Sequence, residues 1–248
     1  MTHTKLFCLA GEDAAHHKLT TRITDRLLVE GIDWLEEGAV LDGTRTWAGL
    51  QSVEYFQLSK ACARAREEKL NFYGGFQNDP KALEARQYRA AILLFMKVCK
   101  PPPTLLIIAR DLDGEPNRRH GFESAVEHTK PPFPVVLAAP QPEAEAWYVA
   151  GYVPRDDTER KRLDEVTRKL GFDPTERPHQ LKSTTHASVR DAKSVLEMLE
   201  PNRDRWIECL DEPWSVLERH GDGSVGMCEF VSHLRAALTV VFPEMRKG

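Results

Sequence analysis

Five carboxylates follow closely on apolar runs of this sequence, and carboxylate oxygens are ligands that hard divalent cations prefer. Glu12 follows KLFCLAG, Asp111 and Asp113 follow LLIIAR, and Glu143 and Glu145 follow VVLAAPQP. If the backbone stays extended through DLD, Asp111 and Asp113 point to one side and can share a cation. We expect Mg²⁺ or Mn²⁺, because such a cation relieves the repulsion between clustered carboxylates and activates a bound water.

The DLD segment also has a structural explanation. Asp-Gly after a strand is a common turn, and Asp111 alone could cap the next helix. Open parallel sheets place their sites at the carboxyl ends of strands, and three predicted strands end in carboxylates here. This agreement favours a metal site over a simple turn.

Four basic residues flank the DLD turn: Arg110, Arg118, Arg119 and His120. A protein that binds nucleic acid needs such groups to hold phosphates, although solvated surface positions explain them equally well. His16 and His17 lie one helical turn after Glu12, and we expect surface positions for both.

These side chains need elements that bring the strand ends together. Continuous apolar runs predict buried strands at residues 4–10 and 135–139 and within 104–114. Apolar residues at helical spacing predict helices at 16–31, capped by Gly31, and at 80–100. A further helix is expected over 118–130. Strands that alternate with helices predict an α/β fold with a mainly parallel sheet flanked by helices.

The character of the sequence changes after Gly151, where the remaining segments are polar and mostly helical. Helices are expected at 155–171, 191–200, 204–221 and 227–242. We therefore predict an α/β core over residues 1–155 and a helical C-terminal extension over 156–248, packed on that core. Residues 33–80 fit strands and helices about equally well.

Composition restricts the class of protein. The chain has 248 residues, 41% hydrophobic and 29% charged, with a formal net charge of −4. These values suit a globular protein with a sizeable core, and no apolar run approaches the roughly 20 residues of a membrane span. The N-terminus does not resemble a signal peptide. The five cysteines are scattered and form no CxxC pair, which favours reduced core thiols in a cytoplasmic protein.

The order of these motifs resembles the Toprim family, and in particular the stand-alone bacterial Toprim-like proteins related to the overcoming-lysogenization-defect nucleases. Glu12 in AGED is similar to the acidic residue after the family's first strand, and ARDLDG to its DxD. The triplet Glu145-Ala146-Trp147 matches a Glu-Ala-Trp motif, and Lys193 in DAK matches a downstream lysine. The resemblance covers roughly residues 4–150 and the stretch around Lys193.

The resemblance implies a metal-dependent nuclease that hydrolyses phosphodiesters, most simply those of DNA. It implies that Asp111 and Asp113 hold the metal, that Glu12 is a ligand or general base, that Glu145 is a further ligand, and that Lys193 stabilises charge on the phosphate. Two features depart from the family pattern. Glu12 is followed by Asp13 instead of glycine, which makes Asp13 a competing ligand, and residues 33–80 exceed a minimal domain and are interpreted as an insertion.

Other functions remain as alternatives. A non-catalytic Toprim-like module would use these carboxylates as caps and surface charge. A haloacid-dehalogenase-type phosphatase also carries DxDG after a buried strand, but Thr or Ser should follow where this chain has Glu115. The resemblance further suggests an ATPase partner and a role in phage defence. Apart from the resemblance, a homo-oligomer is an open option, and the lack of a long apolar run predicts no association with a membrane.

Overall fold

The computed structural model describes residues 4–73, 82–182, 188–219 and 225–245. The chain divides into two compact units. Unit 1 consists of Met1–Arg110, Glu115–Ala138 and Ser232–Gly248, and unit 2 of Asp111–Gly114 and Ala139–Val231. The domain boundary near residue 155 stays a prediction.

Unit 1 is built on a parallel sheet. Its strands are β1 (Lys5–Gly11), β2 (Arg45–Ala48), β3 (Phe56–Gln57), β4 (Leu105–Ala109) and β5 (Val135–Ala138). The order is β2-β1-β4-β5, with β3 pairing the last residues of β1, and every strand pair is parallel. The predicted α/β class with a mainly parallel sheet is thereby confirmed.

Burial explains why the central strands read as unbroken apolar runs. All five residues of β4 are buried, as are the last five residues of β1. A parallel strand covered on both faces has no polar side, so the sequence shows no alternation. This burial fixes the point at which polar residues begin, just after Gly11 and just after Ala109.

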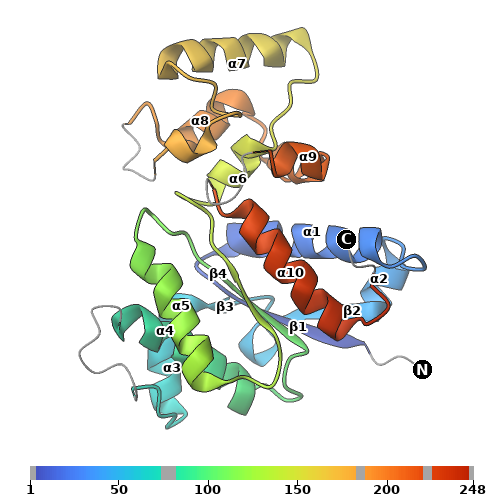
Figure 1. The fold of residues 1–248 in the computed structure, drawn as a ribbon, viewed down its shortest axis with the longest axis vertical. Coiled ribbons are helices and arrows are strands. Elements are labelled where there is room, and N and C mark those ends of the chain that lie inside the picture. Colours follow the sequence, from blue (N-terminus) through green and yellow to red (C-terminus); the bar gives the residue numbers. More distant parts are fainter. Residues whose placement is uncertain (1–3, 74–81, 183–187, 220–224, 246–248) are drawn as a thin grey trace. The chain divides into compact units, whose positions relative to one another are not determined.

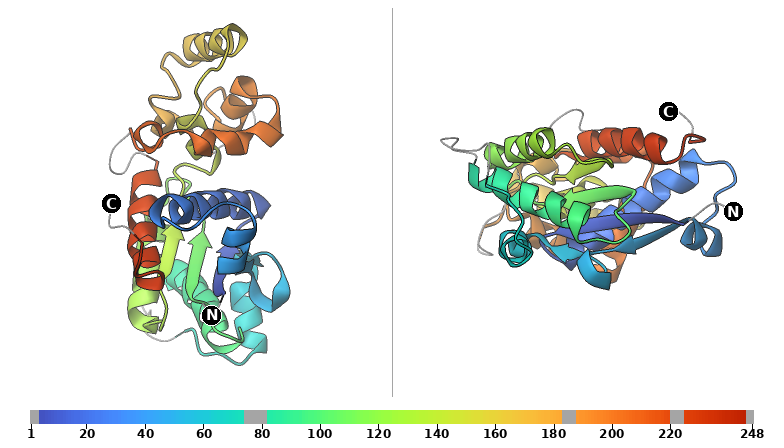
Figure 2. Two further views of the ribbon diagram at one scale, coloured as in Figure 1. Left: turned by 90° about the vertical axis from the view of Figure 1, so that its right-hand side faces the viewer. Right: turned by 90° about the horizontal axis from the view of Figure 1, so that it is seen from below.

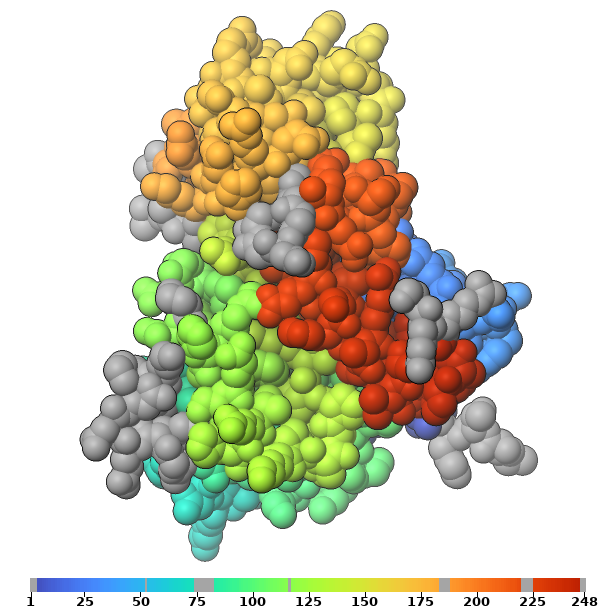
Figure 3. Space-filling model, in the orientation of Figure 1, coloured from blue at the N-terminus to red at the C-terminus, as the bar shows by residue number. Residues whose placement is uncertain are grey.

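Helices connect the strands of unit 1: α1 (Ala14–Gly31), α2 (Ala39–Thr44), α3 (Ala61–Glu67), α4 (Ala82–Lys97) and α5 (Pro116–Thr129). The long helix α10 (Met227–Val241) enters unit 1 at Ser232. In this unit α5 and α10 lie on the same face of the sheet (Figures 1 and 2), and their outer surfaces face the viewer in Figure 3. Within the described part of the chain, no helix has the length and apolar character needed to cross a membrane.

Gly31 ends α1 in a different way from the predicted cap. The helix includes Gly31, and the cap is Ile32 in extended conformation, with φ −124°. A Cβ on Gly31 would lie 2.6 Å from Cε and 2.9 Å from Cγ of Met245. A side chain here would have to displace the end of the Met245 side chain, so the glycine eases the close approach of the C-terminal segment and does not serve a left-handed turn.

Unit 2 is helical, with α6 (Glu145–Ala150), α7 (Asp157–Leu170), α8 (Ala192–Leu199) and α9 (Trp214–Leu217). The single helix expected over 204–221 is instead a 3-10 segment, Arg203–Asp211, followed by α9, because Pro213 cannot continue a helix. Trp147 of α6 is completely buried, stacks on Phe230 and donates its indole N–H to the carbonyl of Val225. It lies in the core, as expected.

Candidate metal site

The register of the sheet brings the ends of β1 and β4 together. Gly11 pairs with Ala109, so that Glu12 and Arg110 leave the sheet side by side. Asp111 is the next residue after Arg110 and therefore lies at the same edge of the sheet. The strand-end argument therefore locates two of the predicted carboxylates, Glu12 and Asp111, at the carboxyl edge of adjacent parallel strands.

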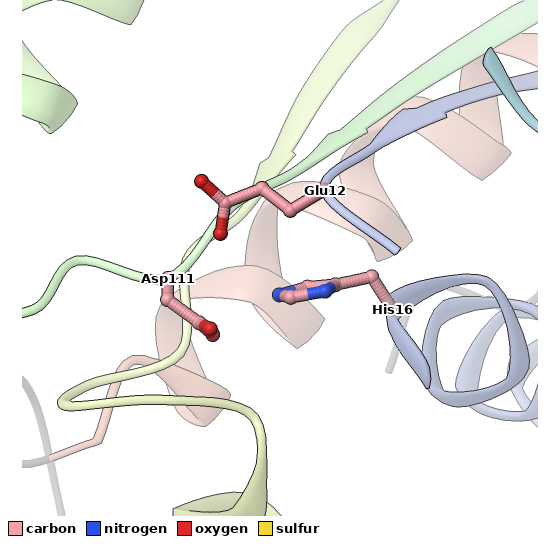
Figure 4. A group of neighbouring side chains, drawn as sticks. All are labelled: Glu12, His16 and Asp111. Atoms are coloured by element: carbon pink, nitrogen blue, oxygen red, sulfur yellow. The ribbon is translucent and has the colours of Figure 1, made fainter. Parts of the chain in front are cut away.

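Glu12, Asp111 and His16 form a group that could hold a metal ion. Each offers one ligand atom, and these atoms all lie within 4.8 Å of one another (Figure 4). The imidazole of His16 is directed toward the two carboxylates in this view, and the residue is only 2% exposed. One imidazole and two carboxylates are a ligand set that suits manganese and other first-row divalent ions.

Asp13 orients His16. It is the N-cap of α1 and accepts hydrogen bonds from the backbone N–H groups of Ala15 (2.9 Å) and His16 (3.1 Å). The same carboxylate oxygen lies 2.9 Å from Nδ1 of His16. These hydrogen bonds, first of all the one to His16, lower the pKa of Asp13 to about 2.

An ionised Asp13 can only accept, so Nδ1 of His16 carries the proton in this pair. In the neutral imidazole, Nε2 then holds the lone pair that a metal ion requires. A carboxylate behind a metal-binding histidine is a common way to fix its tautomer and ring orientation. Asp13, considered from sequence as a competing ligand, is not part of the candidate group and instead holds the ring of His16.

Arg110 is buried next to Glu12. Its Nη1 and Nη2 atoms donate to the carboxylate of Glu84, and Nη1 also donates to Oε1 of Gln87 at 2.9 Å. Its Nε lies 3.3 Å from Oε1 of Glu12, and its guanidinium lies 5.6 Å from the ring centroid of Tyr88. Arg110, predicted to contact phosphate, is engaged by these side chains and is 9% exposed.

This network offsets part of the negative charge at the site. The guanidinium of Arg110 lies between two carboxylates, those of Glu84 and Glu12. Burial raises the pKa of Tyr88 to about 12, so that its phenol stays neutral. Glu12 consequently has a positive partner, itself held by Glu84 and Gln87, on one side, while His16 and Asp111 also lie near it.

Asp113 does not continue the strand, and the expectation of extended backbone through DLD is wrong. Asp113 has φ +48° and Gly114 has φ +73°, so the chain turns with left-handed backbone. The N–H of Asp113 donates to the carbonyl of Pro142, and its side chain is exposed. Among the described residues, the candidate group contains Asp111 but not Asp113.

The remaining predicted ligands belong to unit 2. Glu145 is the first residue of α6 and is partly exposed, and it is not part of the candidate group. Glu143 accepts a hydrogen bond from the backbone N–H of Lys193 at 3.1 Å. Together with Asp191, the N-cap of α8, it holds the first turn of that helix. The roles of Glu145 and Lys193 stay predictions.

The other basic residues predicted to bind nucleic acid lie on the first turns of α5. Arg118 and Arg119 are partly buried, and His120 is exposed. Their contact with phosphate stays a prediction.

His16 is the residue that sequence reasoning missed, and the surface position expected for it is wrong. The sequence feature that could have identified it is its position on the apolar face of α1. His16 precedes Leu19, Ile23 and Leu27 at helical spacing, and all four are buried. A polar residue on the apolar face next to a strand end should have been read as a candidate ligand.

Comparison of the chain with protein-family models, with curated proteins and with solved structures finds no match.

Proposed function

We propose that the chain is a metal-dependent nuclease that hydrolyses phosphodiester bonds. The observation that carries the proposal is the group of Glu12, His16 and Asp111, with ligand atoms within 4.8 Å of one another at the carboxyl ends of parallel strands. The order of motifs that resembles the Toprim family supports the same reaction. Nucleic acid, in the first instance DNA, is the proposed substrate.

The ligand set favours Mn²⁺ over Mg²⁺. Imidazole nitrogen is a good ligand for first-row transition metals, whereas Mg²⁺ prefers an octahedral set of oxygens. A divalent cation held here would make a bound water more acidic and offset negative charge on a phosphate.

Protein groups around the ligands prepare them for such a cation. Asp13 holds His16 through Nδ1, and Arg110 holds Glu12 through an ion pair. Both contacts limit the reorganisation of the ligands on binding. We further propose that Asp113, Glu145 and Lys193 contribute to binding of metal or phosphate, as the resemblance implies.

Metal binding is the first test, measured by titration calorimetry on protein freed of metal with EDTA and then desalted. Wild type should bind Mn²⁺, and Glu12→Gln and Asp111→Asn should each bind it at least tenfold more weakly. The matched control is Asp164→Asn, which removes an exposed carboxylate of α7. Circular dichroism verifies that each variant is folded.

Cleavage is the second test, with supercoiled plasmid and Mn²⁺ or Mg²⁺. Nicking by wild type and by Asp164→Asn, lost in Glu12→Gln and Asp111→Asn, would support the nuclease. Absence of both metal binding and nicking would refute it and favour the non-catalytic interaction module. Metal-dependent hydrolysis of a small phosphate monoester, with plasmid intact, would favour the phosphatase alternative.

The resemblance also suggests a setting, which we propose as an extension. An ATPase partner would explain how a chain with a formal charge of −4 is brought to DNA. Co-purification from the native host, followed by nicking with and without added ATP, tests for such a partner in phage defence. Sedimentation of the purified chain tests the proposed homo-oligomer.

A further inference from the structure

An exposed aromatic ring in unit 1 lies between two arginines. Tyr73 is 45% exposed and stacks on the buried ring of Phe72, with centroids 4.3 Å apart and an interplanar angle of 27°. Phe72 is 1% exposed and fixes the position of its neighbour. Tyr73 is thus the outer ring of an anchored stack, and a large share of its surface faces solvent.

The two arginines come from different helices. Arg66 of α3 donates its Nε–H to the hydroxyl of Tyr73 at 2.8 Å, and Arg86 of α4 lies 5.8 Å from the ring centroid. The distance for Arg86 is near the outer limit of a cation–π contact. A nucleic-acid base that stacks on Tyr73 could displace this guanidinium with little loss of interaction energy. The guanidinium would then lie near the phosphates of the strand that carries the base.

The segments that supply these arginines are basic in a chain that is acidic as a whole. Residues 60–73 and 82–97, the described parts of α3, α4 and their flanks, contain seven Lys and Arg against three Glu, a formal charge of +4. The whole chain carries −4. Of the three glutamates, Glu67 and Glu68 form ion pairs with Arg64, and Glu84 pairs with Arg110. The two segments therefore carry an excess of positive charge, which suits a polyanion.

Helix α4 connects the surroundings of Tyr73 to the candidate metal site. Glu84 and Gln87 hold Arg110, the partner of Glu12, while Arg86 lies between them in sequence and contacts Tyr73. These residues fall within one turn of a helix, whose diameter with side chains is about 10–12 Å. A strand bound on one side of α4 would therefore lie close to the site on its other side.

We propose that Arg66, Tyr73 and Arg86 bind single-stranded nucleic acid, with Tyr73 stacking on an unpaired base and the two arginines contacting phosphates. An aromatic ring next to positive charge is the arrangement that single-strand binding requires, because every base offers a face for stacking. The inference rests on the proposed function in one respect, namely that the bound strand is the substrate of the nuclease. It makes a single strand, or a single-stranded end, the preferred substrate class.

The test is fluorescence anisotropy with a short fluorescein-labelled oligothymidylate, in EDTA so that no cleavage occurs. Wild type should bind this probe more tightly than a duplex of the same length. Tyr73→Ala should weaken binding by about tenfold or more, and Tyr73→Phe, which keeps the ring, should stay within about twofold. Arg66→Gln and Arg86→Gln should each lower the slope of log Kd against log salt by about 0.7.

The control is Arg168→Gln, an exposed arginine of α7, which changes net charge equally and should leave the affinity unchanged. Equal binding of Tyr73→Ala and wild type, or equal loss in Tyr73→Phe and Tyr73→Ala, would overturn the stacking role. Tighter binding of the duplex would overturn the substrate class. Because binding is measured in EDTA, it requires neither bound metal nor cleavage, so a failure of the nuclease proposal remains distinguishable from a failure of this one.

Discussion

Replacing Arg110 by Met tests whether this residue belongs to a buried network or to a nucleic-acid surface. Its side chain is 11% exposed and is held by Glu84, Gln87 and Glu12. Met keeps much of the apolar stem but leaves the two carboxylates without their shared cation. The buried network predicts a loss of stability, whereas a phosphate contact predicts a loss of affinity for nucleic acid.

The magnitude follows from burial. Breaking a buried ion pair by removing one partner typically costs about 3–5 kcal/mol, because the other charge stays behind. Glu84 and Glu12 are 22% and 36% exposed, so water can partly solvate them. We therefore expect a loss at the lower end, about 3 kcal/mol, for Arg110→Met.

Urea unfolding measures this loss, and a double variant identifies its cause. Adding Glu84→Gln to Arg110→Met removes one of the unpaired charges and should restore part of the lost stability. The control is Arg155→Met, whose ion pair with Glu208 is 47% and 40% exposed and should contribute far less. If Arg110→Met unfolds like wild type but binds oligonucleotide with a smaller salt slope, the network role is refuted.

Three further predictions concern Asp13, Gly151 and His16. In EDTA, Asp13→Ala should lower the free energy of unfolding by about 1 kcal/mol, because the N-cap of α1 is lost. The pKa of Asp13 is lowered from 3.8 to about 2, so the ionised carboxylate stabilises the fold. The difference between wild type and variant should therefore shrink as pH falls from 3.8 toward about 2, where Asp13 becomes protonated. Unfolding of both proteins along a pH series measures it, and a constant gap would contradict it. Gly151→Ala places a Cβ 2.0 Å from the carbonyl oxygen of Cys209 and should destabilise unit 2 by roughly 1–3 kcal/mol, whereas the Cβ of Gly43→Ala meets nothing within 4 Å and should be tolerated in thermal melts. His16→Gln should weaken Mn²⁺ binding at least tenfold and reduce the preference over Mg²⁺, and an unchanged ratio of the two calorimetric affinities would exclude His16 as a ligand.

The parallel sheet could be predicted from sequence where its strands are long and fully buried. The run that became β4 is apolar throughout, the run that became β1 is apolar after Lys5, and turn residues mark the ends of both. The strands β2 and β3 have only four and two residues, too few to show a period. They exist because β1 offers them an open edge for pairing, which is a long-range property that no local pattern carries.

The candidate site was predictable in part for the same reason. The strand-end rule found Glu12 and Asp111 because it depends only on where β1 and β4 stop. The contact of Arg110 with Glu84 joins residues 26 positions apart on different elements, and it depends on how α4 packs. A Cβ on Gly121 of α5 would lie 2.7 Å from Cβ of Glu84, which shows how closely that packing sets the position of this carboxylate.

The two aspartates of DLDG take different places because the backbone changes conformation between them. Asp111 continues from β4 and meets Glu12 and His16. Asp113 has left-handed backbone, so the alternation of side chains along the strand no longer applies to it. Its N–H and that of Leu112 donate to the carbonyls of Pro142 and Pro140, which ties the chain immediately after Asp111. The turn thus leaves Asp111 at the strand end with Glu12 and His16. Asp113 would have pointed to the same side only if the backbone had stayed extended.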